Sequence, residues 1–296
     1  MTHKTKNLHF PKIVSEFYKK HPLKTFNSEG KTVEYISSGK GKNTAVLFPG
    51  GGQTAQSNFG MIETLESYFR IISPTLYDLD SIDQFCRILD SLLNHEQIGK
   101  IYIYGLSVGG LLAQSYLFRN PQRVKKIIIS HACTPSSKVF KTKVVLPLKI
   151  LKIFLPFIPD KLIRLAVKKG AMKFQGGNIK SSSPDPWLEN KRNSRLIDHF
   201  SQEFIDKYLT KTLLQTWINI DIGFTKEEFD NKKIQNWSGQ IMILNTDNDP
   251  LVGMDPDFQK LYPKAKMHIF HGTGHLTFFF QYTPLINLVD DFFRSK

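Results

Sequence analysis

The predicted fold centres on one short stretch, Gly105-Leu106-Ser107-Val108-Gly109-Gly110. An apolar, β-prone run at residues 101–104 precedes it, and a helical pattern at residues 111–119 follows it. A Gly-x-Ser-x-Gly sequence between a strand and a helix is typical of a tight turn that presents a serine at the edge of a sheet. Glycines on both sides allow the two backbones to pass closely, and the helix N-terminus favours negative charge beside Ser107. The alternative interpretation is a glycine-rich loop with no chemical role.

Strands and helices alternate on both sides of this stretch. Short apolar runs predict buried strands, and the longer runs between them have helical periodicity, which together indicate an α/β fold with a mostly parallel central sheet flanked by helices. Residues 134–239 contain helical periods, prolines and loops but no convincing strand pattern. We therefore predict a core of residues 1–133 and 236–296, and a helical insertion of residues 134–235. The expected strands are 23–26 and 32–36 (a β-hairpin), 44–48, 70–73, 101–104, 124–130, 240–245 and 266–270, with helices that include 56–68 and 284–293.

Composition limits the class of protein. The chain has 296 residues, of which 41% are hydrophobic, and this suffices for one large domain. The N-terminal residues carry charge but lack the apolar region of a signal peptide, and no uncharged stretch reaches the ~18 residues that span a bilayer. Cys86 and Cys133 are too few and too far apart in sequence for a disulfide framework. These features predict a cytoplasmic protein.

The net charge of +14 is concentrated in one region, because residues 134–180 contain eleven lysines and arginines and a single acid, Asp160. Within that region, residues 144–159 are apolar apart from Lys149 and Lys152, which share one narrow face if the segment is helical. One interpretation is a buried lid helix packed on the rest of the insertion. The other is a segment that lines an apolar acyl pocket and also contacts an anionic membrane peripherally. Nucleic acid is disfavoured, because the charges alternate with aliphatic side chains and not with stacking aromatic ones.

A serine becomes an effective nucleophile when a histidine accepts its proton and an acid orients that histidine. Asp249 follows the strand predicted at 240–245, and His275 follows the strand predicted at 266–270. These positions complete a pattern by which the chain resembles the cap-bearing branch of the α/β-hydrolase superfamily, over about residues 30–133 and 236–296. The matching motifs are Phe48–Gly52, Gly105–Gly110, Asp249–Val252 and Gly272–His275, in this order.

This resemblance implies a catalytic triad of Ser107, Asp249 and His275. The family's acid directly precedes a Pro-hydrophobic-Val turn, which selects Asp249 over the nearby Asp247. The family's histidine lies in a Gly-x-Gly-His turn, which selects His275. Two other histidines, His131 and His271, stand near strand ends, where they either line the pocket or have a purely structural role.

The resemblance also implies an oxyanion hole, in which backbone amides stabilise a negatively charged oxygen. Its donors are the amide of Val108 and that of Gly51 in the loop Pro49-Gly50-Gly51-Gly52, where Pro49 replaces the histidine more common in the family. Gly52 and Leu106 are the expected substrate contacts. Alternatively, the loop at residues 49–52 forms only a sharp turn. A phosphate-binding role is disfavoured, because neither a GxGxxG pattern nor a Walker lysine is present.

The expected activity is that of a serine hydrolase that cleaves a carboxylic ester of an apolar or lipid-like substrate through an acyl-enzyme. No cofactor or metal is expected, because the sequence has neither an HExxH nor a CxxC pattern. The same site suits a thioesterase, an amidase, a C–C hydrolase or an acyltransferase. The alternative from another class of function is a non-catalytic binding module on this fold. The sequence does not indicate an oligomeric state.

Overall fold

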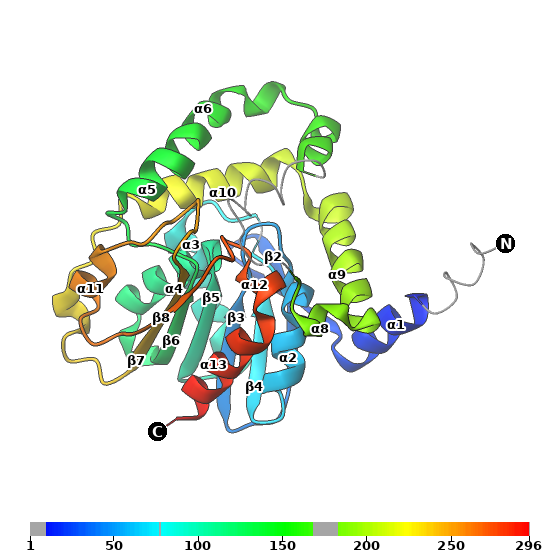
Figure 1. The fold of residues 1–296 in the computed structure, drawn as a ribbon, viewed down its shortest axis with the longest axis horizontal. Helices are drawn as coiled ribbons and strands as arrows, with labels where there is room; N and C mark the ends of the chain where they lie inside the picture. The colour runs from blue at the N-terminus through cyan, green and yellow to red at the C-terminus, as the bar shows by residue number, and fades with distance from the viewer. Residues whose placement is uncertain (1–9, 77, 168–182, 296) are drawn as a thin grey trace.

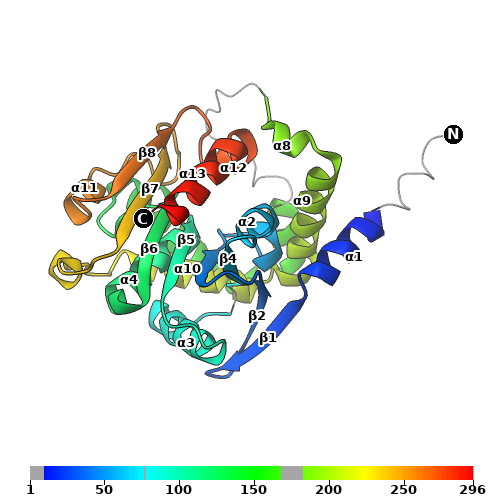
Figure 2. The ribbon, with the colours of Figure 1, turned by 90° about the horizontal axis from the view of Figure 1, so that it is seen from below.

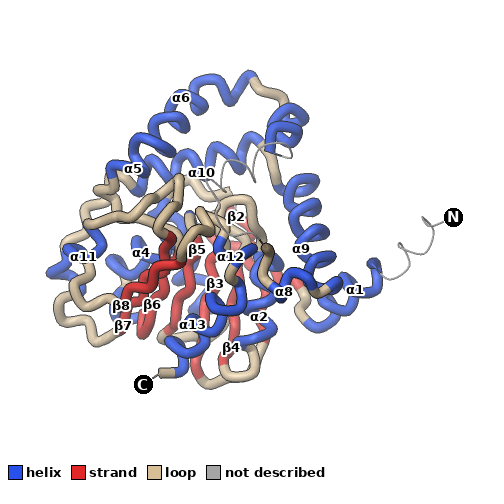
Figure 3. The backbone as a smooth tube through the Cα atoms, in the orientation of Figure 1, coloured by secondary structure: helices blue, strands red, loops and turns tan. Residues whose placement is uncertain are grey.

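The computed structural model describes residues 10–76, 78–167 and 183–295. Eight strands form one sheet: β1 (Leu23–Ser28), β2 (Lys31–Ser38), β3 (Asn43–Phe48), β4 (Phe69–Pro74), β5 (Ile101–Leu106), β6 (Val124–Ser130), β7 (Gln240–Thr246) and β8 (Lys266–Phe270). Their order in the sheet is β1-β2-β4-β3-β5-β6-β7-β8. Figure 3 shows the strands, in red, at the centre of the molecule with helices around them. The β1–β2 and β2–β4 pairs are antiparallel, and the remaining pairs are parallel. The predicted α/β fold with a mostly parallel sheet is therefore confirmed.

The central strands are apolar throughout because both faces of the sheet are covered. Successive side chains of a strand point to opposite faces, and in β6 this separates Ile127 and Ile129, which pack in one hydrophobic cluster, from Ile128, which packs in another. Helices α3 (Ile82–His95) and α4 (Val108–Arg119) contribute buried side chains to the first cluster. Helices α1 (Phe10–Lys20), α2 (Phe59–Leu65) and α13 (Tyr282–Arg294) supply the second. Figure 2 shows these two groups of helices on opposite sides of the sheet.

The predicted N-terminal hairpin is formed by β1 and β2, which pair from Leu23 and Ile36 to Ser28 and Lys31. The two residues of its turn, Glu29 and Gly30, have φ angles of 52° and 73°. Positive φ at both central residues is the geometry of a type I′ turn, whose twist matches that of the flanking strands.

The described residues between β6 and β7 form helices and loops and contain no strand. Figure 1 shows α6 and α10 running across one edge of the sheet, with α9 at the side. The C-terminal half of α10 also joins the core, because Ile220 and Phe224 pack in the same cluster as α3 and α4. The described residues of this region are called the cap below. Its helical elements include α5 (Lys138–Phe140), η3 (Lys141–Val145), α6 (Leu146–Phe154), η4 (Leu155–Phe157), α8 (Pro186–Glu189), α9 (Lys191–Glu203), η5 (Phe204–Tyr208), α10 (Lys211–Phe224) and η6 (Asn231–Ile234).

Local structure differs from the sequence-based prediction in two places. The helix expected at 56–68 is divided into a short helix η1 (Ala55–Asn58) and α2, and the buried side chain of Asn58 ties the junction to the sheet by donating to the Leu47 carbonyl and Ser73 Oγ. Two further helices, α11 (Asp257–Leu261) and α12 (Thr277–Phe280), are too short to show a periodic pattern. No helix in the described part of the chain is both long enough and apolar enough to cross a membrane.

Candidate active site

The turn between β5 and α4 holds Ser107 in a backbone conformation that is rare for a residue with a side chain. Its φ and ψ angles are 53° and −119°, and such strain persists only where the surroundings impose it. The neighbouring glycines show how close the backbones pass: a Cβ atom on Gly105 would lie 2.5 Å from the carbonyl oxygen of Gly109. Side chains at these two positions would force the strand and the helix apart and change the direction in which Ser107 points.

Ser107, His275 and Asp249 form one hydrogen-bonded chain at the carboxyl ends of β5, β8 and β7. Ser107 Oγ lies 2.9 Å from His275 Nε2, and His275 Nδ1 lies 2.7 Å from Asp249 Oδ2. Because an ionised carboxylate only accepts hydrogen bonds, Nδ1 carries the ring proton and donates a hydrogen bond to Asp249. Nε2 is then free to accept the hydroxyl proton of Ser107. The structure therefore brings together the three residues predicted as the triad.

Asp249 is buried but remains the ionised partner. Its Oδ1 accepts hydrogen bonds from the amides of Leu251 and Val252, at 2.9 and 3.2 Å. Burial raises the pKa of the Asp249 carboxyl, but the charge of His275 and the hydrogen bond from its ring outweigh burial and lower that pKa below its ordinary value. The carboxylate is thus held in the form that orients the imidazole.

Asp247, the alternative acid, has a different partner. Its Oδ2 lies 2.9 Å from Nδ1 of His271 in a solvent-exposed pair, and its Oδ1 accepts from the amide of Gly272 at 3.0 Å. The adjacent Asn248 accepts from the amide of Gly274 at 2.9 Å. These contacts tie the loop that carries the acid to the loop that carries the histidine. Asp247 and His271 therefore lie beside the triad without joining it.

His131 packs against the histidine of the triad. Its ring is buried, and its centroid is 5.8 Å from that of His275 in an edge-to-face arrangement. Both ring nitrogens have hydroxyl partners: Nδ1 lies 2.9 Å from Ser130 Oγ, and Nε2 lies 2.7 Å from Thr277 Oγ1. Burial lowers the pKa of His131 to about 3, and the charge of His275 acts in the same direction. His131 is therefore a neutral ring that packs beside the triad histidine.

The glycine loop after β3 lies directly over the serine turn. A Cβ atom on Gly51 would be 3.5 Å from Val108 Cγ2, and one on Gly109 would be 2.6 Å from the carbonyl oxygen of Phe48. The amide of Val108 is at the first position of α4, where the helix offers it no acceptor. The loop is braced by Gln53, whose Oε1 accepts from the amide of Gly50 at 2.9 Å. The two amides predicted for the oxyanion hole thus belong to neighbouring segments.

A cavity of about 50 Å³ opens beside Ser107 and His275. Its apolar lining comes largely from residues after His275, and the three consecutive phenylalanines 278–280 are the sequence signal that could have indicated this wall. Leu106, predicted as a substrate contact, lines the cavity. Gly52, the other predicted contact, instead faces Phe204 of the cap, with its added Cβ at 4.0 Å from that ring. The described lining residues are Gly50, Gly51, Gln53, Leu106, Ser107, His131, His275, Leu276, Phe278, Phe279 and Leu285.

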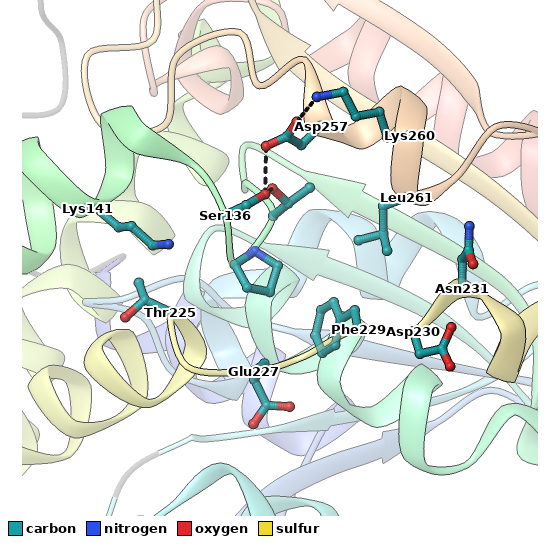
Figure 4. Close-up of a pocket in the computed structure, with 12 residues that line it drawn as sticks. Ser136, Lys141, Thr225, Glu227, Phe229, Asp230, Asn231, Asp257, Lys260 and Leu261 are labelled. Atoms are coloured by element: carbon teal, nitrogen blue, oxygen red, sulfur yellow. Dashed lines mark hydrogen bonds and ion pairs between the residues drawn. The ribbon is translucent and has the colours of Figure 1, made fainter.

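A larger cavity of about 600 Å³ lies between the cap and α11 (Figure 4). Three of its polar residues pair with one another: Asp257 accepts hydrogen bonds from Ser136 Oγ and from Lys260 Nζ, both at 2.7 Å. None of the triad residues is among its described lining residues. In the described part of the chain, no three histidine, cysteine or acidic side chains are placed to hold a metal ion.

Comparison with known proteins agrees with this geometry. The family described as "alpha/beta hydrolase fold" matches residues 45–282, so this chain belongs to the α/β-hydrolase family. It is 28% identical over 123 residues to the uncharacterized hydrolase YcgS of Bacillus subtilis (strain 168), an alignment that covers 39% of this chain and 43% of that protein. It is 23% identical over 275 residues to 2-hydroxy-6-oxononadienedioate/2-hydroxy-6-oxononatrienedioate hydrolase 1 of Pseudomonas putida, covering 82% of this chain and 85% of that protein.

Solved structures share the fold. MGS-M2, an alpha/beta hydrolase enzyme from a Medee basin deep-sea metagenome library, superposes with a TM-score of 0.66 at 15% sequence identity, covering 92% of this chain and 98% of that chain. At this level of identity, the likeness concerns the fold alone.

Proposed function

We propose that this protein hydrolyses a carboxylic ester of an apolar substrate through a covalent acyl-enzyme. The observation that carries this proposal is the hydrogen-bonded chain from Asp249 through His275 to Ser107, with distances of 2.7 and 2.9 Å. The chain gives the serine a base within hydrogen-bonding distance and gives that base a buried carboxylate, which is the arrangement that nucleophilic catalysis by a hydroxyl requires.

In the first half of the reaction, Ser107 Oγ attacks the ester carbonyl carbon while His275 Nε2 takes the hydroxyl proton. The carbonyl π electrons move to the oxygen and form a tetrahedral oxyanion. When that intermediate collapses, the bond to the leaving alcohol breaks, and His275 returns the proton to the alcohol. Asp249 holds the ring and stabilises its transient positive charge. The product of this half is an acyl group on Ser107.

In the second half, water replaces the alcohol. His275 accepts a proton from the water, the hydroxide attacks the acyl carbon, and collapse of the second oxyanion releases the acid and returns a proton to Ser107 Oγ. The amides of Val108 and Gly51 are the proposed donors to both oxyanions. Donors fixed in place before the reaction stabilise the developing charge without reorganisation, which makes them a large contribution to catalysis.

The proposed substrate is apolar because of the side chains beside the serine. Leu276, Phe278, Phe279 and Leu285 line the cavity, and its described lining contains no lysine or arginine. Burying a carboxylate without a partner is unfavourable. A doubly anionic compound, such as the one named for the Pseudomonas putida relative, therefore fits the described surroundings of Ser107 less well than a neutral acyl or aryl ester.

The test is hydrolysis of a panel of aryl esters with increasing acyl length, assayed beside a 2-hydroxy-6-oxo-dienoate. We expect ester hydrolysis, with longer acyl chains preferred over acetyl, and loss of at least about a thousandfold in kcat/KM in Ser107→Ala. The matched control is Ser201→Ala, which alters an exposed serine on α9. A dienoate cleaved faster than every ester would assign the triad to C–C bond hydrolysis, and a clear preference for acetyl would contradict the apolar substrate.

A further inference from the structure

The outer surface of the cap carries a row of large apolar side chains exposed to solvent. Phe157 is 83% exposed, Ile153 is 68% exposed and Phe154 is 58% exposed. Isolated exposed apolar residues are ordinary on proteins, but a contiguous group marks an interaction surface. This group, called the α6 face below, consists of Leu146, Ile150, Ile153, Phe154 and Phe157.

The spacing of these residues places them on one side of a helix. They follow one another at intervals of four, three, one and three residues, so they form a single stripe along α6 and η4. Leu148, Leu151 and Leu155 occupy the opposite side and pack on the cap cluster that contains Leu213. The interpretation of this segment as a buried lid helix packed on the rest of the insertion is correct in its packing and wrong in its burial, since α6 contains no buried residue and only one side of it packs on the cap cluster.

Lysines border the α6 face. Lys143 and Lys149 are exposed on the same segment, whereas Lys138 and Lys141, also exposed, lie before it near Asp257 of α11. Residues 134–167 contain a single acid, Asp160. Its Oδ1 is directed inward and accepts a hydrogen bond from the backbone amide of Lys211 at 3.1 Å. The surface is thus apolar at its centre and cationic at its border. Figure 1 shows α6 as an outermost element of the molecule, on the side of α10 that faces away from the sheet.

We propose that the α6 face docks this protein on an anionic lipid bilayer. An apolar stripe enters the boundary between headgroups and acyl chains, and lysines beside it bind the acidic headgroups, which is how amphipathic helices attach to membrane surfaces. Phe157 and Ile153, the two most exposed members, are the residues that insert. Lys143 and Lys149 are the residues that contact headgroups.

Charge complementarity favours a bilayer over the other occupants of such a face. A second copy of this chain seated on the same face would bring two lysine borders together, and like charges at close range oppose association. Nucleic acid would match the charge but leave the aliphatic stripe without a partner. An anionic bilayer satisfies both the apolar centre and the cationic border.

Docking by this face is independent of the chemistry proposed for Ser107. The α6 face contains no member of the triad, so Ser107→Ala should bind vesicles as the wild type does. A wild-type protein that binds vesicles but hydrolyses no ester would overturn the proposed function alone. Retained esterase activity without vesicle binding would overturn the docking proposal alone.

The experiment is flotation of the full chain with phosphatidylcholine vesicles that contain about one third phosphatidylserine, compared with vesicles of phosphatidylcholine alone. We expect binding to the anionic vesicles that weakens as salt is added, since salt screens charges at a surface. The variants Lys143→Glu/Lys149→Glu and Ile153→Asn/Phe157→Asn should each lower the partition coefficient at least about tenfold.

Matched controls separate docking from net charge and from folding. Lys100→Glu/Lys264→Glu makes the same charge change at the amino ends of β5 and β8, the edge of the sheet opposite to the triad, and should bind vesicles within about twofold of wild type if local charge dominates. Tyr68→Asn removes an exposed aromatic residue elsewhere. Equal losses in the α6-face and control variants would overturn the proposal. So would absence of wild-type binding, or concentration-dependent dimerisation that Phe157→Asn abolishes.

Discussion

His275 Nδ1 lies 2.7 Å from Asp249 Oδ2, and the two side chains are 6% and 0% exposed. A second acid–histidine pair, Asp247 with His271, lies next to it at 2.9 Å but is exposed to solvent. The two pairs come from the same two loops, so the chain offers an internal comparison between a buried pair that contacts Ser107 and an exposed pair that does not.

Asp249→Asn should reduce kcat/KM for an aryl ester by at least about a thousandfold, because an amide leaves His275 without a fixed tautomer and without a stabilising charge. Asp247→Asn should change it by less than about threefold, because exposed ion pairs contribute little. Steady-state kinetics of both variants, with circular dichroism to verify folding, provide the measurement. Equal losses in the two variants would remove the distinction between the acids.

Gly109→Ala should destabilise the protein and impair activity. The added methyl group would lie 2.6 Å from the carbonyl oxygens of Phe48 and Pro49, so the backbone of the glycine loop must move. We expect a loss of about 2 kcal/mol in the free energy of unfolding, as for overpacking of a core. We also expect kcat to change by a larger factor than KM.

The matched control is Gly223→Ala on α10, where the new methyl group would meet only Ile82 at 3.7 Å. Because alanine favours helix more than glycine does, this variant should be as stable as wild type or more stable. Urea denaturation of both variants makes the comparison. A Gly109→Ala protein with unchanged stability and kcat would show that the loop tolerates displacement.

His131 should make the protein less stable in mild acid. Its folded pKa is lowered to about 3 by burial, whereas the unfolded side chain titrates near 6.5. Between these values the unfolded chain binds a proton that the folded chain does not, so its contribution to stability is complete above about pH 6.5 and declines as the pH falls. The expected loss from this residue is about 2 kcal/mol between pH 7 and pH 5.

The measurement is the free energy of unfolding of His131→Gln at those two pH values. The loss of stability on acidification should be smaller by about that amount in His131→Gln than in wild type. His268→Gln, which alters an exposed histidine of β8, should retain the wild-type dependence. If His131→Gln and wild type lost the same free energy of unfolding between pH 7 and pH 5, the neutral, buried state of this ring would be contradicted.

Asp221 should have the opposite effect and lower the stability of the protein as the pH rises toward neutral. This residue of α10 is buried, and its Oδ1 atom has no hydrogen-bond partner among the described residues. Burial raises its pKa to about 7, whereas the unfolded carboxyl ionises near 3.9. The folded chain therefore keeps a proton that the unfolded chain releases, and stability declines as the pH rises from about 4 to 7.

Asp221→Asn removes this proton linkage. We expect the variant to be more stable than wild type by about 4 kcal/mol at pH 8 and by less at pH 5. Asp198→Asn, at an exposed position of α9, serves as the control and should show no such difference. An Asp221→Asn protein that is equally destabilised at both pH values would indicate an ionised Asp221 with a stabilising partner.

The sequence predicts the core and the triad well because their signals are local. Ser107 stands between a strand and a helix whose patterns are clear, and Asp249 and His275 each follow an apolar strand. In a parallel sheet the carboxyl ends of strands meet at one edge. Order along the chain is then enough to bring the three residues together.

Features that depend on what a helix packs against are not predictable in this way. The apolar pattern of residues 144–159 predicts a helix but does not indicate which side is covered, and in the structure Leu155 is buried whereas Phe157 is exposed. The wall formed by Phe278 and Phe279 lies on a helix of four residues, which is too short to show a period. Both outcomes depend on tertiary contacts between segments far apart in sequence.

The central claim is that Ser107 is the nucleophile, and the most direct measurement is mass spectrometry of the protein after reaction with a fluorophosphonate. This reagent forms a stable bond with a serine that a neighbouring base has activated. We predict one adduct per chain, located by peptide mapping on Ser107 and absent from Ser107→Ala. An adduct on another residue, or equal labelling of Ser107→Ala and wild type, would contradict the assignment.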